Sequence, residues 1–594
     1  MNDDIHNANP ITEQFKTIYE ALYNEQEGLK NNFCEEVEKR VCDNVYEAQS
    51  TVSLFIPDLV RSAVKKLKPD KSDVSGMFTS DCLKAAPDLF FENMAHLFRL
   101  FLSHGHVSYD LLVCALCPIV KDSNGDITSS KNYRGIALSS LILKVLDNCI
   151  LLLYGNLFSN DVLQYGFQKG LSTIQCTWAV QETISNYLRN GSEVYCCLLD
   201  FSKAFDKVNF EKIFSILMDR QLPAILLRLI LVIYQNQSCF IQWNGHNSSR
   251  FRVKDGVRQL AILSPSLFCV YLDTHISKLR ESGIGCHLGG MFVGSFGYAD
   301  DLTLLAPTRQ GLQLMLGICE QWAKEHDMQF STDPIPSKSK SKCLFFSRHR
   351  SADDISNLEL NGDKLPWVSS AKHLGNHLSS EINGACVIPD MSEDLRCKRG
   401  MLFDKVHQIK QQFGHLDPYL TMKLLSVYAT ALYGSSLWQL NSSDYSKLCR
   451  SWNTAVKIIW DLPLNTHTRF LENLSPVAHL ESVLAGRYIG FLNSLSTTSN
   501  KVLGLIYNQC TDNVNTQTGL NKRYLMEKHS VSTFSDLVKM KTEIKYKRNN
   551  MLDEDEIWKI DVIKDIVLSR KGLLCMDALD NDEMEDLLKF VCSS

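Results

Sequence analysis

Two adjacent aspartates in an apolar setting are the residues of this chain whose types and spacing best predict chemistry. Tyr298-Ala299-Asp300-Asp301 lies between the apolar runs 291–297 and 302–306, which predicts a β-hairpin with the aspartates at its tip. Neighbouring carboxylates repel each other and resist desolvation, so this placement is unfavourable without a cation. A divalent metal ion removes the repulsion. The pair therefore predicts a metal site, against the alternative of an exposed turn, where aspartate is also common.

A third carboxylate follows another apolar run. Asp200 ends residues 194–199, which read as a buried strand that emerges at a cleft. Two-metal phosphoryl transfer needs a carboxylate pair and a third carboxylate from a neighbouring strand. Asp200, Asp300 and Asp301 are therefore the predicted catalytic and metal-binding side chains.

The surrounding motifs widen this pattern. Eight short motifs follow one another in the chain, at 118–121, 132–136, 164–173, 200–206, 256–259, 263–268, 298–301 and 372–375. Their order resembles that of reverse transcriptases from non-LTR (LINE-like) retrotransposons, strongly over about residues 60–380. A lone Tyr-x-Asp-Asp is a weak signal, whereas eight motifs in order are specific.

The resemblance implies an α+β fold: a right-hand polymerase with fingers, a split β-α-β palm, a helical thumb and a mixed, mainly helical C-terminal extension. The expected boundaries are an N-terminal linker and helix at 1–50, fingers at 51–170, palm at 171–350, a primer-grip hairpin at 351–384, thumb at 385–475 and the extension at 476–594, with the reverse transcriptase domain at about 100–380. In that family an endonuclease domain precedes this region. We therefore expect a chain truncated upstream, without the endonuclease.

The implied activity is RNA-directed DNA synthesis, in which a primer 3′-hydroxyl attacks the α-phosphate of a dNTP. The implied partners are an RNA template, a DNA primer and dNTPs. The implied cofactor is a pair of Mg²⁺ ions, with Mn²⁺ as a substitute, held by the three aspartates and the Phe201 carbonyl.

Other residues take substrate-binding roles by the same resemblance. The residues expected at the incoming nucleotide are Lys121, Arg134, Phe205, Gln259 and Lys340. An aromatic ring at 205 would clash with a ribose 2′-hydroxyl, although a phenylalanine is also an ordinary core residue. Lys340 resembles a lysine that protonates the departing pyrophosphate, and Lys338 and Lys342 are alternatives for that role.

Primer and template contacts are expected from Tyr298, Ser264, Pro265, His373 and Gly375. Ser264 is predicted to cap a helix that has Pro265 in its first turn. His373 belongs to the expected primer-grip hairpin, with a structural rather than a catalytic role.

One position departs from the family pattern. The family has glycine after the Arg-Gln pair, whereas this chain has Leu260 after Gln259. Glycine at such a position indicates close backbone approach or positive φ. Two alternatives follow: the loop shifts, or polymerisation is impaired. In the second case the chain would be a remnant that binds nucleic acid or acts as a scaffold.

Composition sets broad limits. The chain has 594 residues, 45% of them hydrophobic and 22% charged, which is typical of a globular protein with several subdomains. The net charge of −5 comes mainly from residues 551–594, which carry twelve acidic and five basic side chains. We expect no signal peptide, no membrane span, reduced cysteines and an intracellular location in the nucleus or the cytoplasm. The sequence sets no oligomeric state.

Overall fold

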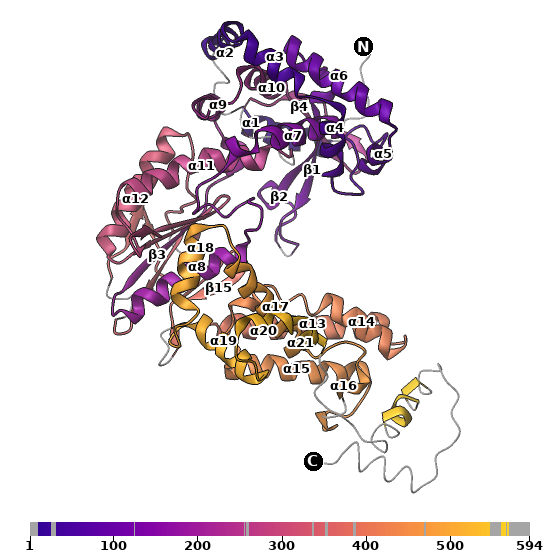
Figure 1. Ribbon diagram of the computed structural model, residues 1–594, viewed down its shortest axis with the longest axis vertical. Helices are drawn as coiled ribbons and strands as arrows, with labels where there is room; N and C mark the ends of the chain where they lie inside the picture. The colour runs from indigo at the N-terminus through magenta and orange to yellow at the C-terminus, as the bar shows by residue number, and fades with distance from the viewer. Residues whose placement is uncertain are drawn as a thin grey trace.

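A computed structural model describes residues 10–24, 31–123, 125–254, 256, 261–335, 338–350, 355–383, 388–468, 471–546, 560–565 and 567–568. The chain forms three lobes in a row (Figure 1). An N-terminal lobe of helices around a sheet is followed by a central lobe built on a second sheet, and then by a lobe of helices. This mixed α+β architecture agrees with the fold class predicted from the sequence.

The N-terminal lobe contains a five-stranded sheet in the order β2-β1-β4-β5, with β6 also paired to β4. Its strands are β1 (Val113–Val120), β2 (Tyr133–Leu138), β4 (Ser238–Trp243), β5 (His246–Asn247) and β6 (Phe251–Arg252). β1 and β2 pair antiparallel, with Ile119 opposite Arg134. This hairpin carries the motifs at 118–121 and 132–136.

Helices surround this sheet. They are α1 (Pro10–Leu22), α2 (Asn31–Asp43), α3 (Val45–Ser53), α4 (Pro57–Lys65), α5 (Ser80–Lys84), α6 (Asp88–His104), α7 (Leu141–Tyr154), α9 (Phe210–Asp219) and α10 (Ala224–Gln235). The described part of the expected N-terminal linker and helix is helical, and α1 packs on the sheet through buried Phe15 and Tyr19. A further difference concerns 210–252, expected in the palm. These residues lie in the N-terminal lobe, because β4 pairs in parallel with β1.

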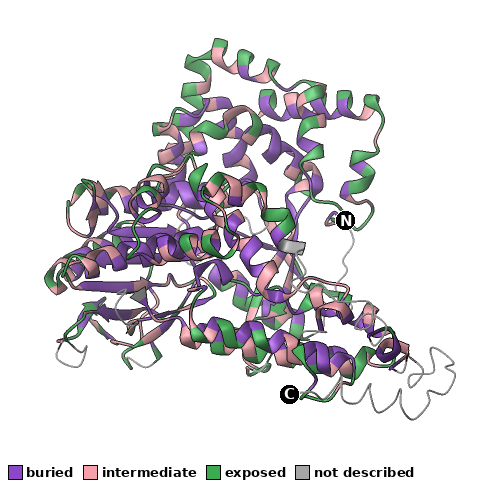
Figure 2. Ribbon diagram, turned by 60° about the horizontal axis from the view of Figure 1, so that its bottom comes forward, coloured by how far each residue is buried: buried purple, intermediate pink, exposed green. Residues whose placement is uncertain are grey.

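The central lobe has a four-stranded antiparallel sheet in the order β11-β3-β10-β9. Its strands are β3 (Val194–Leu199), β9 (Ser295–Tyr298), β10 (Asp301–Ala306) and β11 (Lys342–Phe346), and its helices are α8 (Thr173–Arg189), α11 (Ser264–Glu281) and α12 (Arg309–Glu325). A two-stranded ribbon, β7 (His287–Leu288) and β8 (Met291–Phe292), precedes β9. The strand–helix–hairpin–helix order agrees with the sequence prediction, and buried residues fill the layer between sheet and helices (Figure 2).

Three small hairpins follow the central lobe: β12 (Leu358–Leu360) with β13 (Asp363–Leu365), β14 (Ser370–His373) with β15 (Asn376–Ser379), and β16 (Ile382–Asn383) with β17 (Ile388–Pro389). The sequence predicted a single primer-grip hairpin within 351–384. The first of the three hairpins, which turns at Asn361-Gly362, packs on α12, where the Gln313 side chain bonds to the Glu359 backbone. The second hairpin, which turns at Leu374-Gly375, is the one joined to the aspartate-bearing sheet.

The C-terminal lobe is helical, with α13 (Ser392–Phe413), α14 (Pro418–Tyr428), α15 (Ser443–Ile459), α16 (Leu471–Leu474), α17 (Leu480–Ser496), α18 (Lys501–Cys510), α19 (Gln517–Lys528), α20 (Phe534–Lys539) and α21 (Lys541–Tyr546). The expected boundary at 475 does not divide it. Asn521 of α19 accepts a hydrogen bond from the Leu440 backbone, and α17 contacts both α15 and α21. Residues 480–546 therefore complete the same helical lobe (Figure 1).

One helical stretch in the described residues, Leu141–Phe158, is long and apolar enough to cross a membrane, and half of it is buried. Asp147 in its middle accepts hydrogen bonds from the backbone of Ile262 and Leu263. A helix that is bonded in this way to the start of α11 is a core helix of the N-terminal lobe.

Candidate functional site

The three predicted carboxylates meet at one end of the central sheet. Asp200 directly follows β3, Asp300 lies in the turn between β9 and β10, and Asp301 is the first residue of β10. Leu302 pairs with Leu199 in the antiparallel register. Continuing that register by one residue places Asp301 opposite Asp200, so residues a hundred positions apart come together at the sheet edge.

The tight turn is held from outside the hairpin. The Gln164 side-chain oxygen accepts hydrogen bonds from the backbone N–H of Ala299 and of Gly166, each at 2.9 Å. Ala299 has a φ of 54°, in the left-handed region that non-glycine residues rarely adopt. A Cβ atom at Gly166 would lie 2.3 Å from the Ala299 nitrogen, so only glycine fits there. The motif at 164–166 therefore positions the turn, a role that sequence reasoning did not assign to it.

A neighbouring segment fixes the backbone at Asp200. The Ser331 N–H donates to the Asp200 carbonyl at 2.7 Å, and the Ser202 N–H donates to the Gln329 carbonyl at 2.8 Å. Between them, the Phe201 ring stacks on Phe330 with centroids 4.3 Å apart. These bonds do not involve the Phe201 carbonyl, which the sequence prediction assigned to metal binding.

Burial, followed by like charge, dominates the electrostatics of Asp300 and Asp301. Burial raises the pKa of Asp300, and the Asp200 carboxylate adds to the rise, while Arg134 and Lys340 partly offset it. Partial desolvation, followed by the charges of Asp300 and Asp200, raises the pKa of Asp301 to about 6. The carboxyl groups of Asp300 and Asp301 thus hold protons more tightly than usual, as expected where a cation is needed to balance them.

Three cationic side chains that the sequence analysis assigned to this site lie near the aspartates. Lys340 Nζ lies 3.5 Å from Asp200 Oδ2. This ion pair distinguishes it from Lys338 and Lys342, which form no ion pair with Asp200 among the described residues. Lys121 and Arg134 approach from the end of the β1–β2 hairpin. Partial desolvation and the nearby charges of Arg134 and Lys340 lower the pKa of Lys121. The site therefore brings cations of two lobes together around the carboxylates.

Phe205 lies in the turn after Asp200 and is partly buried. Its ring stacks on Phe268 of α11, with centroids 4.1 Å apart and planes inclined by 18°. The exposed ring of Phe167 meets it edge-on at 6.2 Å. Phe205 is therefore braced on two sides rather than enclosed in the core.

The start of α11 differs in detail from the prediction. Ser264 is the first helical residue rather than the cap, and its hydroxyl lies 3.3 Å from the buried Tyr234 hydroxyl. The backbone N–H groups of Ile262 and Leu263, just before the helix, donate instead to the Asp147 carboxylate. Pro265 does lie in the first turn. Ser264 is buried, so its side chain does not line the template surface that the sequence suggested.

His373 and Gly375 of the β14–β15 hairpin have different surroundings. His373 is buried, with Nδ1 3.1 Å from Thr177 Oγ1 and Nε2 2.9 Å from Thr303 Oγ1. Its ring joins α8, β10 and β14, which fits a structural role and leaves no ring atom for a primer. Gly375, with a φ of 86°, leaves room for the Tyr433 ring, since a Cβ there would lie 2.9 Å from that ring.

Tyr298 ends β9 opposite Asp301 and is half-buried. Burial and the nearby Tyr433 raise the pKa of its hydroxyl, which stays protonated at neutral pH. Gln259 and Leu260 lie outside the described residues, so the structure bears on neither the predicted contact nor the effect of the leucine.

The carboxylate set has the chemistry of a divalent metal site, although the described side chains include no cluster of three potential ligands already closed around one point. Asp200 Oδ2 is buried and accepts no hydrogen bond from the described residues, although it forms the ion pair with Lys340. A buried carboxylate oxygen with unused acceptor capacity, beside the proton-retaining carboxyl groups of Asp300 and Asp301, fits a hard cation with oxygen ligands. The described cysteines, among them Cys114 and Cys117 on β1, form no disulfide with one another.

Comparison with known proteins gives a consistent picture. Residues 120–378 match the family described as reverse transcriptase (RNA-dependent DNA polymerase). The chain is 26% identical over 238 residues to a Pol polyprotein of the type-1 retrotransposable element R2 from Nasonia vitripennis, covering 40% of this chain and 23% of that protein. It is 21% identical over 404 residues to the RNA-directed DNA polymerase from mobile element jockey of Drosophila melanogaster, covering 65% of this chain and 42% of that protein.

A third relative is the probable RNA-directed DNA polymerase from transposon X-element of Drosophila melanogaster, at 22% identity over 417 residues, which cover 67% of this chain and 43% of that protein. The chain thus spans less than half the length of these relatives. Residues 120–378 contain all three aspartates and the whole four-stranded central sheet.

Proposed function

We propose that this chain, whose residues 120–378 form a reverse transcriptase domain of the non-LTR retrotransposon kind, is an RNA-directed DNA polymerase that adds dNTPs to a DNA primer on an RNA template. In this proposal the N-terminal, central and C-terminal lobes serve as fingers, palm and thumb. The observation that carries it is the register of β3 and β10, which places Asp301 opposite Asp200 beneath cations from two lobes.

Asp200, Asp300 and Asp301, with the Phe201 carbonyl, would hold two Mg²⁺ ions, for which Mn²⁺ is the expected substitute. When bound, such ions lower the pKa of an attacking hydroxyl and stabilise charge on a pyrophosphate leaving group. The residues of the chain orient the substrates. Because Asp200 and Asp301 face each other across adjacent strands, both can reach one primer end without moving the sheet.

Lys121, Arg134 and Lys340 would bind the triphosphate of the incoming dNTP. Arg134 presents a rigid fork of donors, and Lys121 a point charge, both on the fingers side. Lys340 lies on the palm side beside Asp200 and would donate a proton to the departing pyrophosphate. Phe205, braced by Phe268, would exclude a ribose 2′-hydroxyl.

Gln259 would contact the nucleotide or the template, and the turn at Gly375 would support the primer end next to Tyr298. The hairpin is anchored for this by Tyr433, whose hydroxyl donates to the Leu374 carbonyl at 3.0 Å. Pro265 would keep the start of α11 rigid beside the template.

The test is Mg²⁺-dependent primer extension on an RNA template with three proteins: the wild type, Asp300→Ala/Asp301→Ala and Leu260→Gly. Extension by the wild type that the double variant abolishes supports the proposal. Extension by Leu260→Gly alone assigns the chain to the impaired remnants. No extension by any of the three folded proteins would reject polymerase activity.

A further inference from the structure

Helix α1 lies far before the matched segment 120–378, yet it is built into the N-terminal lobe. Its apolar face shares a small core with the sheet, consisting of Phe15, Tyr19, Leu22, Tyr23, Cys114, Leu116, Ala137, Cys239, Ile241, Phe251 and Val253. The Phe15 ring meets Tyr133 edge-on at 5.1 Å and lies 5.4 Å from Trp243. Such packing fixes the rotation of the helix over β1, β2 and β4.

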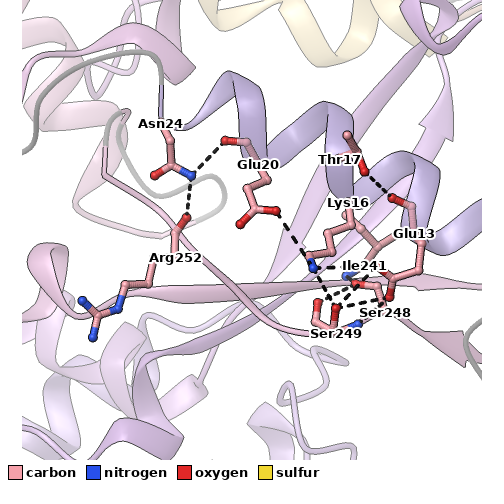
Figure 3. A network of polar contacts seen from close by, with 9 residues as sticks. All are labelled: Glu13, Lys16, Thr17, Glu20, Asn24, Ile241, Ser248, Ser249 and Arg252. Carbon is pink, nitrogen blue, oxygen red and sulfur yellow. Dashed lines mark hydrogen bonds and ion pairs between the residues drawn. The ribbon is translucent and has the colours of Figure 1, made fainter. Parts of the chain in front are cut away.

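Polar contacts fix its position along the sheet edge (Figure 3). Glu13 accepts a hydrogen bond from the Ser249 backbone at 2.9 Å, and Lys16 donates to the Ser249 hydroxyl at 2.8 Å. At the other end, the Asn24 amide donates to the Arg252 carbonyl at 3.2 Å. The Lys254 N–H donates to the Tyr23 carbonyl at 3.0 Å. The helix is thus attached at both ends.

Tyr19 in α1 and Tyr23, which directly follows the helix, reach the segments that carry the residues proposed to bind the nucleotide. The Tyr19 ring lies against Gly135, where a Cβ atom would come within 2.9 Å of it, and Gly135 directly follows Arg134. Tyr23 is 4% exposed and its side chain hydrogen-bonds to Asp206, which directly follows Phe205. Burial and the Asp206 charge raise the pKa of the Tyr23 hydroxyl, so it stays protonated and acts as the donor.

Asp206 interacts with several parts of the proposed nucleotide site. Its charge acts on Lys121, where it partly offsets the effect of the surrounding cations. Its backbone packs against Gly256, where a Cβ would lie 2.7 Å from the Asp206 carbonyl oxygen. The Gly256 N–H also donates to the Val208 carbonyl at 3.1 Å. A shift of Asp206 would therefore move both the Phe205 turn and the field at Lys121.

We propose that α1 is part of the nucleotide-selecting machinery of this chain, with Tyr23 as the positioning residue that holds Asp206 and, through it, the Phe205 turn. Tyr19 supports the same arrangement from beneath Gly135. The inference rests on the proposed function, because it concerns the nucleotide that the site would select.

The experiment measures nucleotide binding without bond formation. The full chain is bound to an RNA template and a DNA primer that ends in a 3′-deoxy nucleotide, and the affinities for the next matching dATP and ATP are titrated with Mg²⁺. Tyr23→Phe removes one hydroxyl and keeps the ring in the core. It should lower the preference for dATP over ATP by about tenfold, as expected for a lost hydrogen bond to a charged group.

Tyr154→Phe is the matched control, since its hydroxyl donates to Thr51 at 3.4 Å in the same lobe, away from Asp206. The control should keep the wild-type preference. In an Asp206→Ala background, Tyr23→Phe should have no further effect, because the acceptor of the shared bond is gone. These two results together support the inference.

An unchanged preference in Tyr23→Phe would overturn the inference, as would an equal loss in Tyr154→Phe. A wild type that binds neither nucleotide would also overturn it. Primer extension by the wild type separately judges the proposed polymerase. A chain that binds and discriminates nucleotides but extends nothing would lose the proposed activity and keep the positioning role of Tyr23.

Discussion

The Gln164 side chain holds the Ala299 backbone at 2.9 Å, across 135 positions of sequence. Through this bond a segment that precedes α8 fixes the turn that carries Asp300 and Asp301. The bond also supports the left-handed conformation of Ala299, which on its own is unfavourable by about 1 kcal/mol. The position of the aspartates is therefore set by the hairpin and by a neighbour outside it.

We expect Gly166→Ala to displace this turn, because the added Cβ would lie 2.3 Å from the Ala299 nitrogen. Primer extension should fall by at least about a hundredfold, since a displacement of about 1 Å at a reacting group has an effect of that size. The control is Gly317→Ala in α12, where nothing lies within 4 Å of the new atom. It should keep full activity and gain slight stability. Equal activity in both variants would contradict the role given to residue 166.

The pairing of Lys340 with Asp200 leads to a second prediction. Lys340→Ala should reduce extension by about a hundredfold or more if this lysine is the proton donor. Lys338→Ala removes an equal charge two residues earlier, on an exposed side chain, and should change the rate less than about threefold. Similar losses in the two variants would show that the run of lysines only attracts phosphate.

Local patterns allowed much of this fold to be predicted. The hairpin that carries Asp300 and Asp301 and the strand that ends at Asp200 follow from apolar runs that lie within about twenty residues of their turn residues. Asp200, Asp300 and Asp301 could be paired because each follows an apolar strand. Their expected neighbours Lys121, Arg134 and Lys340 came from the family resemblance.

Long-range relationships could not be predicted in this way. The parallel pairing of β4 with β1 moves residues 210–252 out of the expected palm, and no local pattern encodes it. The same holds for α19, which completes the lobe expected to end at 475. Asp147 replaces Ser264 as the acceptor at the start of α11, because a distant side chain provides an oxygen where the local one points into the core. The role of Gln164 is invisible for the same reason, since it is directed at a backbone group.

The stack of Phe205 on Phe268 predicts that selectivity depends on the second ring. Phe268→Leu keeps an apolar side chain in α11 but removes the flat surface on which Phe205 rests. Incorporation of rNTPs relative to dNTPs should rise by several-fold, since an aromatic pair contributes about 1 kcal/mol beyond burial. Competing dNTP and rNTP extension assays measure the ratio. Phe330→Leu is the control, because that ring stacks on Phe201 instead; it should leave the ratio unchanged, and a similar rise there would argue against a specific brace.

The raised pKa of Asp301 predicts a stability gain when its charge is removed. Its folded-state pKa of about 6 lies above the ordinary value of 3.8, so the folded state binds the proton more tightly. This contribution is present below pH about 4 and is lost as the pH rises through about 6. At pH 7.5 without Mg²⁺, Asp301→Asn should therefore raise the thermal midpoint, on the order of 1 °C or more. The gain should vanish at pH 4 and shrink when Mg²⁺ is added to the wild type, and its persistence at pH 4 would point to another cause.

His373 contributes with the opposite sign over an overlapping range of pH. Burial lowers its pKa to about 4, below the ordinary 6.5, because the ring is held between Thr177 and Thr303 as a neutral group. The stability it contributes is present above pH about 6.5 and is lost as the pH falls towards 4, by on the order of 3 kcal/mol. His373→Gln should lower the thermal midpoint at pH 7. It should also reduce the amount by which the thermal midpoint falls between pH 7 and pH 5. Thermal unfolding of the wild type, His373→Gln and Asp301→Asn at pH 7 and pH 5 separates the contributions of His373 and Asp301, since Asp301→Asn should make the thermal midpoint fall more between these two pH values. A fall in His373→Gln as large as that of the wild type would mean that another group controls the acid sensitivity.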